Sequence, residues 1–194
     1  MGKIGFAFDV TKQIANFVKT CNKNSVLQTK FLFRPNLNEF IVLLKQQNGE
    51  KICRYIRNEK QIGEIRYVIS KGNIGKYPDY YLDVVGKNKV TKPSVFISHL
   101  EAQGCGANLM KVAAKDAEKF TDGRMILDAQ SVDGMTSPDA FYYKLGFRKL
   151  NQKENELIKE YIDKGEKIPP DTFSDRMYLP KEKLFHLLNY KKKY

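Results

Sequence analysis

Several features that define other classes of protein are scarce in this sequence of 194 residues. Its three cysteines, Cys21, Cys53 and Cys105, are an odd number at wide spacing, and no Cys-x-x-Cys pair occurs. Only two histidines are present, His99 and His186. These counts exclude a disulfide scaffold and the usual zinc patterns, so we predict that the protein needs no metal.

Long apolar runs are missing as well. No run of 18 apolar residues occurs, so we expect no membrane span. Lys12 and Lys19 flank an amphipathic run in place of the continuous apolar segment of a signal peptide. Phe6 occupies the position where N-myristoylation requires Ser or Thr. We therefore expect a cytoplasmic protein.

Acidic residues are outnumbered, with 22 Asp and Glu against 34 Lys and Arg, and the net charge is +12. Such a charge attracts polyanions, whether coenzyme phosphates, acidic substrates, nucleic acid or anionic lipid. A lysine-rich surface also serves plain solubility, so a nucleic-acid partner is not favoured. The length and a hydrophobic content of 42% fit one domain over residues 1–194, as a monomer or homodimer.

The apolar patterns predict a mixed sheet flanked by helices. Strands are predicted at 26–33, 52–56, 62–70, 80–85, 94–100, 125–130, 147–150 and 176–179. Helices are predicted at 9–20, 36–47, 138–145, 151–164 and 181–190, and a further helix starts in the loop after residue 100 and ends at residue 120. Short connections between the early strands favour antiparallel pairing. The strand, helix, strand order from 94 to 130 indicates a parallel crossover. We therefore predict an α/β fold with a mixed, mostly antiparallel sheet.

A glycine loop follows the strand predicted at 94–100, in the motif Glu101-Ala-Gln-Gly104-Cys-Gly106-Ala-Asn108. The two glycines have no Cβ, so another group can approach the backbone closely. An amphipathic run to Phe120 places a helix N-terminus at this loop, where unpaired N–H groups favour a phosphate. A tight strand-to-helix turn also needs glycine, so this motif alone leaves both interpretations open.

A second motif comes about thirty residues later and reads Ser137-Pro-Asp-Ala-Phe-Tyr142-Tyr-Lys-Leu-Gly146-Phe147. Ser137 suits the N-cap of a short helix, with Pro138 at its first position, and Gly146 can end it in a left-handed conformation. The aromatic residues of this helix could pack in the core or face a ligand.

The two motifs together resemble those of the GNAT superfamily of N-acetyltransferases, over about residues 94–150. The resemblance implies a splayed parallel strand pair, with loop amides holding the pyrophosphate of acetyl-coenzyme A. It also implies direct attack by a primary amine, with Tyr142 protonating the leaving thiolate. The implied cofactor-binding residues are Leu100, Glu101, Gln103, Gly104, Cys105, Gly106, Ala107, Asn108, Ser137, Phe141 and Lys144. Residues 1–50 would shape the acceptor site, and 151–194 would add a helix, a strand and a terminal helix.

Two positions depart from the family pattern. Glu101 stands where the family prefers Gln or Arg, and its carboxylate beside a diphosphate would cost roughly a kcal/mol unless it points away. Gln103 or Lys111 could supply the missing donor. Met135 stands where the family usually has Asn, so Ser137 or the backbone must make that hydrogen bond.

For the general base we select His99, whose residue type has a suitable pKa, with Glu101 nearby in sequence. A plain strand residue, with the proton relayed through water, is the alternative. Cys105 is disfavoured as a nucleophile because no base is placed near it. Lys144, Arg148 and Lys149 could meet coenzyme phosphates or form a solvated basic face.

A second class of function remains open, which is binding without catalysis. A GNAT-like domain could serve as an acyl-coenzyme sensor, or as a basic nucleic-acid or ribosome-binding module. In the latter, Tyr55, Tyr67 and Tyr77 would be the stacking groups.

Overall fold

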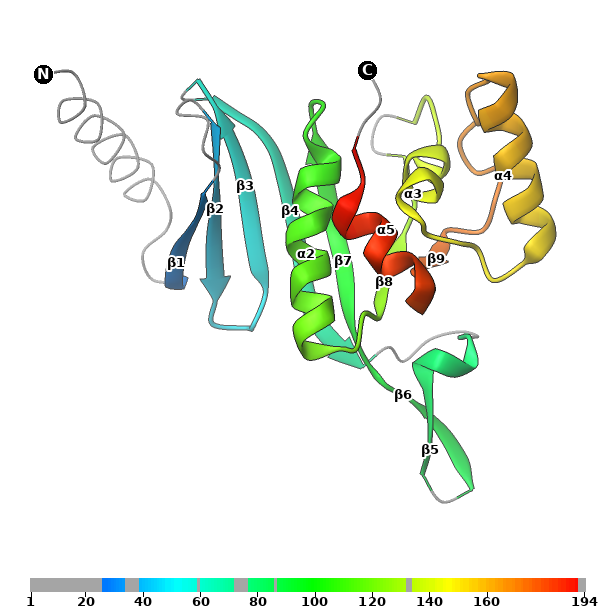
Figure 1. Cartoon of the computed structure of the whole chain (residues 1–194), viewed down its shortest axis with the longest axis horizontal. Coiled ribbons are helices and arrows are strands. Elements are labelled where there is room, and N and C mark those ends of the chain that lie inside the picture. The colour runs from blue at the N-terminus through cyan, green and yellow to red at the C-terminus, as the bar shows by residue number, and fades with distance from the viewer. Residues whose placement is uncertain are drawn as a thin grey trace, which may run out of the picture.

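The computed structural model describes residues 26–33, 39–58, 60–71, 77–85, 87–131 and 134–191, so the helix predicted at 9–20 lies outside the described residues. A seven-stranded sheet runs in the order β1-β2-β3-β4-β7-β8-β9 (Figure 1). Its strands are β1 (Val26–Phe33), β2 (Glu39–Gln46), β3 (Lys51–Arg57), β4 (Lys60–Lys71), β7 (Pro93–Ala102), β8 (Met125–Asp128) and β9 (Arg176–Tyr178).

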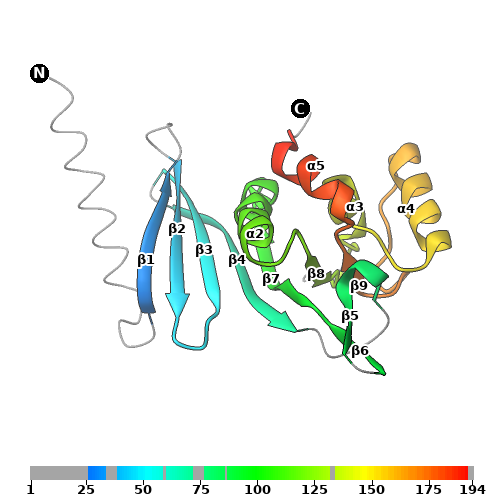
Figure 2. The same cartoon turned by 60° about the horizontal axis from the view of Figure 1, so that its bottom comes forward.

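The remaining elements stand on or beside this sheet. The helices are α2 (Gly106–Phe120), α3 (Asp139–Leu145), α4 (Gln152–Lys164) and α5 (Leu184–Asn189), with short 3-10 turns at Asp79–Tyr81 and Lys181–Lys183. Strands β5 (Leu82–Val85) and β6 (Asn88–Thr91) pair only with each other and project from the body of the protein (Figures 1 and 2).

Strand pairing confirms the predicted mixed sheet. The β7–β8 pair is parallel, and the other neighbours in the sheet are antiparallel. Helix α2 makes the crossover between β7 and β8, as a parallel connection requires. The protein is thus an α/β protein with a mostly antiparallel sheet flanked by helices.

The parallel pair separates towards the carboxyl end of β7. Its register runs from Val95 opposite Met125 to Ile97 opposite Leu127, and β7 then continues alone on this side as far as Ala102. On its other side β7 carries a bulge against β4, because Ile97 and His99 pair with consecutive residues of β4 and Ser98 is the extra residue. A bulge bends a strand and increases its twist, which here accompanies the opening between β7 and β8.

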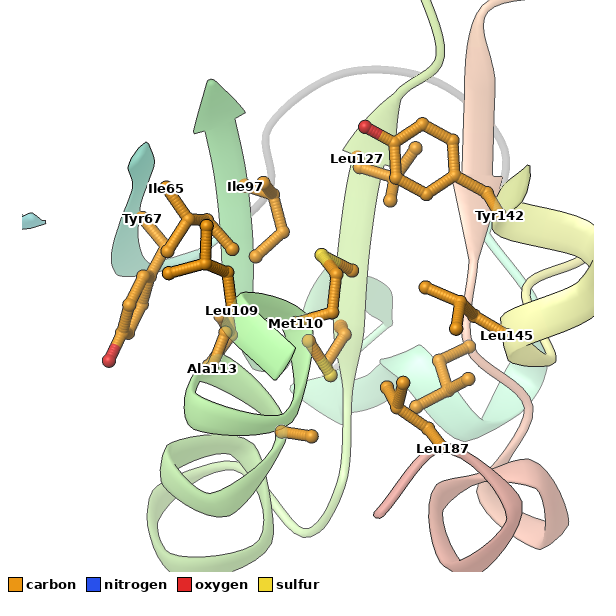
Figure 3. Packing of buried hydrophobic residues seen from close by; sticks show 14 of the residues in the cluster. Ile65, Tyr67, Ile97, Leu109, Met110, Ala113, Leu127, Tyr142, Leu145 and Leu187 are labelled. Atoms are coloured by element: carbon orange, nitrogen blue, oxygen red, sulfur yellow. The ribbon is translucent and has the colours of Figure 1, made fainter. Parts of the chain in front are cut away.

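The main core lies between the sheet and its covering helices. Leu109, Met110 and Ala113 of α2 are fully buried, with Leu109 and Ala113 beside Ile65 and Tyr67 of β4 and Met110 on the side of β8 (Figure 3). Both views of the ribbon place α5 beside α2 on this face, with α3 and α4 farther along (Figures 1 and 2). The described part of the chain contains no helix both long and apolar enough to cross a membrane.

The helix predicted at 36–47 is wrong for residues 39–46, which form β2. Phe40, Leu43 and Leu44 have helical spacing, yet Ile41 and Leu43 face α2, while Val42 and Leu44 contribute to a second buried cluster. Because both faces of this strand are buried, its apolar residues run continuously and show no alternation.

Three other predicted elements differ in extent. The strand at 80–85 begins as a 3-10 turn and continues as β5, outside the main sheet. The strand at 147–150 is reduced to a single bridge between Arg148 and Tyr178. The terminal helix at 181–190 starts with a 3-10 turn, and α5 ends at Asn189.

Candidate coenzyme site

The glycine loop connects the free end of β7 to α2, and its two glycines are required for different reasons. Gly104 has a φ of 76°, a left-handed conformation that a residue with a Cβ rarely adopts. At Gly106 the limit is space, because an added Cβ would lie 3.0 Å from Cζ of Phe141. The loop therefore brings the start of α2 close to α3.

Helix α2 presents its N-terminus to the same place. The N–H groups of Asn108 and Leu109 donate to the carbonyl of Cys105, at 3.0 and 3.2 Å. The N–H groups of Gly106 and Ala107 come before these bonds, where an α-helix lacks internal partners. Together with the positive end of the helix dipole, this backbone can receive an anion.

Helix α3 supplies the opposing wall. It ends at Gly146, whose φ of 109° confirms the predicted left-handed end. Pro138 occupies the N-cap position, one residue later than predicted, and the Ser137 hydroxyl accepts a hydrogen bond from the Asp139 N–H at 3.2 Å. The Tyr142 ring reaches from α3 over Leu127 of β8, with its hydroxyl directed away from the helix (Figure 3).

These elements enclose a pocket of about 490 Å³. Its wall is formed by Leu100, Ala102, Gly104, Gly106, Ala107, Pro138, Phe141, Tyr142, Lys144 and Tyr190. A second hollow of about 710 Å³ shares Lys144 and Tyr190 with it, and its lining includes the basic residues Lys183 and Lys191, the acidic Glu182, and His186. An apolar pocket therefore meets a basic hollow, which suits a ligand with an apolar arm and an anionic end.

Most of the predicted site residues meet in this pocket. The predicted residues that line it are Leu100, Gly104, Gly106, Ala107, Phe141, Tyr142 and Lys144. Glu101 does not, because side chains alternate along a strand and its neighbours Leu100 and Ala102 take the pocket side. The Glu101 carboxylate is 73% exposed and lies 4.0 Å from His99, so it points away from the loop amides.

Four other predicted residues lie outside the pocket wall. Gln103 is exposed, and its N–H donates to Ile62 at 2.8 Å. The Cys105 thiol is buried beneath the loop against the Ile62 carbonyl, and burial raises its pKa, which agrees with no nucleophilic role. Asn108 is half-buried in the first turn of α2. Ser137 donates its hydroxyl hydrogen to Asp139 at 2.7 Å, so that hydrogen is not available to a cofactor.

The two predicted catalytic residues have different surroundings. Tyr142 is only 7% exposed, and burial, assisted by the negative charge of Asp139, raises its pKa to about 12. Its ring packs edge-on against Phe141 and Phe147. His99 lies on β7 beside Leu100, with a side chain 37% exposed on the face opposite to the pocket.

Three residues of the pocket wall escaped the sequence analysis. Ala102 and Pro138 flank predicted residues, and the period-two pattern of β7 could have pointed to Ala102. Tyr190 comes from the end of α5 and no local motif marks it. The Tyr190 carbonyl accepts a short hydrogen bond from Nζ of Lys111. Lys111 is therefore bonded to the residue that follows α5, and it is not placed to supply the phosphate donor that Glu101 lacks.

Several basic and aromatic residues have structural roles. Lys149 has a side chain with no exposed area and pairs with Asp139, so it cannot contact a coenzyme phosphate. Arg148 stacks on the Tyr143 ring at 3.8 Å. Tyr55 and Tyr67 are 1% and 0% exposed, so their predicted role as stacking groups for nucleic-acid bases is wrong. Among the residues that the structure describes, no cluster of His, Cys, Asp or Glu could hold a metal ion.

The fold and site together define an α/β protein with a mixed sheet and a ligand pocket where its parallel strands separate. No protein-family profile and no curated protein matches the sequence. Among solved structures, a tyrosine-to-phenylalanine mutant of the AtaT toxin bound to the C-terminus of the antitoxin AtaR has 14% identity and a TM-score of 0.42, covering 74% of this chain and 73% of that chain. AtaTR bound with AcCoA has 16% identity and a TM-score of 0.40, covering 79% and 77%. Similarities this low assign no activity to the chain.

Proposed function

We propose that the protein is an N-acetyltransferase that moves an acetyl group from acetyl-coenzyme A to a primary amine. The observation that carries this proposal is the meeting of three features in one pocket. These are the N-terminus of α2 with its glycine loop, the opening between β7 and β8, and the buried phenol of Tyr142.

Each part of the pocket suits one part of this co-substrate. The amides of Gly106 and Ala107 would hold the pyrophosphate, and Lys144 with the basic hollow would meet further phosphate charge. The apolar wall of Leu100, Ala102 and Phe141 would take the pantetheine arm. The AtaTR neighbour was solved with AcCoA, but the support for this chain comes from its own pocket.

In the reaction, the neutral amine nitrogen attacks the thioester carbonyl carbon, the C–S bond breaks, and the thiolate accepts a proton. With a pKa of about 12, Tyr142 keeps its proton at neutral pH and can donate it as charge develops on sulfur. An ordinary thiol has a pKa near 8.5, which is below that of Tyr142. Tyr142 would therefore first stabilise the thiolate by donating a hydrogen bond, and its proton would pass to the sulfur only late in the reaction. Because His99 lies on the face of β7 opposite to the pocket, the sequence-based choice of this residue as the base is not retained, and the amine proton would pass to water.

Thermal unfolding with and without acetyl-coenzyme A tests the binding step. At about a hundred times its dissociation constant, a ligand adds roughly 2.7 kcal/mol to the unfolding free energy, so Tm should rise. The Gly106→Ala variant should reduce this rise, because its methyl group would lie 3.0 Å from Cζ of Phe141, which lines the same pocket, so the ring must shift.

Gly49→Ala is a control glycine substitution away from the pocket, where no atom lies within 4 Å of the new Cβ, although the left-handed conformation of Gly49 is itself strained by a side chain. It should keep the full rise over its own Tm. A pocket that does not recognise acetyl-coenzyme A in the unmodified protein would refute the proposal. Binding without thiol release across a panel of amines would instead favour the acyl-coenzyme sensor.

A further inference from the structure

A buried ion pair lies at the base of α3. The Asp139 carboxylate is 2.6 Å from Nζ of Lys149, and the two side chains are only 3% and 0% exposed. Its second oxygen accepts the hydrogen of the Ser137 hydroxyl at 2.7 Å. Nζ of Lys149 also donates to the carbonyls of Ser174 and Asp175. The pair therefore joins the start of α3 to a loop about thirty-five residues farther along the chain.

Helix α4 holds the other side of this network. Asn155 bonds both backbone groups of Lys149, with its oxygen accepting from the N–H and its amide donating to the carbonyl, each at 2.8 Å. Glu154 accepts from the N–H and the hydroxyl of Ser174, each at 2.9 Å. Both the backbone of Lys149 and its ammonium group are therefore held by specific partners.

Stability alone does not explain a pair in this position. Removing two charges from water costs so much that apolar residues of similar volume often stabilise a protein as well or better. What the pair supplies is a fixed neighbour for each charge, since either charge would be left uncompensated in the interior if the two side chains moved apart. Helix α3 needs such a constraint because it has only seven residues, and the bond from the Asp139 N–H to the Ser137 hydroxyl ties only its first N–H group.

Tyr142 stands three residues after Asp139 on α3 and therefore on the same side of the helix. Its aromatic contacts are with Phe141 and Phe147, and its ring also lies over Leu127 (Figure 3). We propose that the buried Asp139–Lys149 ion pair is a positioning device that fixes α3, and with it the Tyr142 hydroxyl, at the wall of the pocket. Its catalytic consequence rests on the acetyltransferase function proposed above.

The test replaces both charges with neutral side chains of similar size, in the double variant Asp139→Asn/Lys149→Met. Lys149→Met alone would leave a buried carboxylate without its partner and could unfold the protein, so the double variant is the decisive one. Its Tm should stay close to the unmodified value, and its dissociation constant for acetyl-coenzyme A should rise by a smaller factor than kcat falls, since Phe141 and Lys144 also lie on α3. Its kcat should fall about 10- to 100-fold, because a small displacement of a catalytic group has effects of this size.

A coenzyme-independent readout accompanies the kinetics. In protein labelled with ¹³C-tyrosine, the Tyr142 ring signal is assigned by its loss in Tyr142→Phe, and it should shift or broaden in the double variant. The control is Asp163→Asn/Lys159→Met, which removes an exposed pair of the same residue types on α4, 3.6 Å apart, and should change neither kcat nor the ring signal.

An unchanged ring signal together with an unchanged kcat would overturn the inference, and so would a fall in kcat that merely follows a fall in Tm. If the unmodified protein neither binds nor turns over acetyl-coenzyme A, the proposed function fails. The positioning role is then tested by the Tyr142 ring signal alone. A changed signal in the double variant supports this role, and an unchanged signal overturns it.

Discussion

At the scale of single residues, Tyr142 combines two properties that sequence analysis treated as alternatives. It is a core aromatic, 7% exposed and packed between Phe141 and Phe147, and it also forms part of the pocket wall. Its hydroxyl enters a wall that is otherwise mostly apolar. In an apolar pocket, a single polar group of this kind fixes the orientation of a bound ligand by a hydrogen bond.

Tyr142→Phe should separate these two properties. The ring and its packing remain, so Tm and acetyl-coenzyme A affinity should stay nearly unchanged. Loss of the proton donor should lower kcat by roughly 10²- to 10⁴-fold, the usual contribution of general acid catalysis. Steady-state thiol release measures it, with Tyr143→Phe as the control from the same helix. Unchanged turnover, or a large loss of stability, would make Tyr142 a packing residue.

Glu101 shows at the same scale how one side-chain direction resolves a conflict in the motif. Beside a diphosphate its carboxylate would be unfavourable, but the pleat of β7 turns it to the opposite face near His99. The glycine motif thus keeps its amides for an anion although residue 101 is acidic.

At the scale of elements, a charge cluster around the nearly buried Glu64 links β3 and β4. Glu64 accepts from Nε of Arg54 and from Nε of Arg66, each at 2.7 Å. Burial alone would raise the pKa of Glu64, but the hydrogen bonds and charges of Arg66 and Arg54 outweigh it, so the pKa is lowered. Its charged form is therefore favoured by folding.

This lowered pKa makes a prediction about stability and pH. A carboxylate with a depressed pKa contributes stability above its unfolded value of about 4.3, and loses that contribution as pH falls through the lower folded value. Glu64→Gln should therefore be less stable at pH 7, by about 1.5–3 kcal/mol for lost bonds to charged groups. The difference from the unmodified protein should shrink below about pH 4.3.

Urea unfolding at several pH values measures this difference. Glu118→Gln, at an exposed position of α2, provides a control that should follow the unmodified protein throughout. A difference that stays constant down to the acid limit would show that ionisation of Glu64 does not couple to folding.

At the scale of the whole molecule, part of the net charge of +12 is concentrated beside the pocket. The basic hollow formed with Lys183, His186 and Lys191 borders the apolar pocket at Lys144 and Tyr190. Residues of α3, of α5 and of the segment after α5 thus converge on one mouth, which a positive field can make attractive to a phosphate-bearing ligand.

Acetyl-coenzyme A binding should weaken as salt rises, because the screening length falls from about 30 Å at 0.01 M to about 3 Å at 1 M. Calorimetric titration at low and high ionic strength measures the dissociation constant. Lys144→Ala should weaken binding at low salt and reduce this dependence. Lys164→Ala, at an exposed site on α4, should not. A salt-independent dissociation constant would leave the net charge without a role in capture.

Local information in the sequence was sufficient for the central β7-α2-β8 unit and for the helix of the second motif. Gly104, Gly106 and Gly146 mark turns through their own backbone chemistry, and apolar periodicity marks the elements between them. These features depend on neighbours within a few residues, so the sequence determined the mixed character of the sheet, whereas the pocket residues were predicted from the resemblance of the two motifs to a known family.

Tertiary structure decided what depends on distant parts of the chain. It made 39–46 a strand because both faces of that segment are covered, and it brought Tyr190 from α5 to the pocket. It also turned Lys149 from an expected surface cation into the buried partner of Asp139. Burial and charge pairing arise only when separate elements pack together, and no local pattern encodes which partner a side chain will meet.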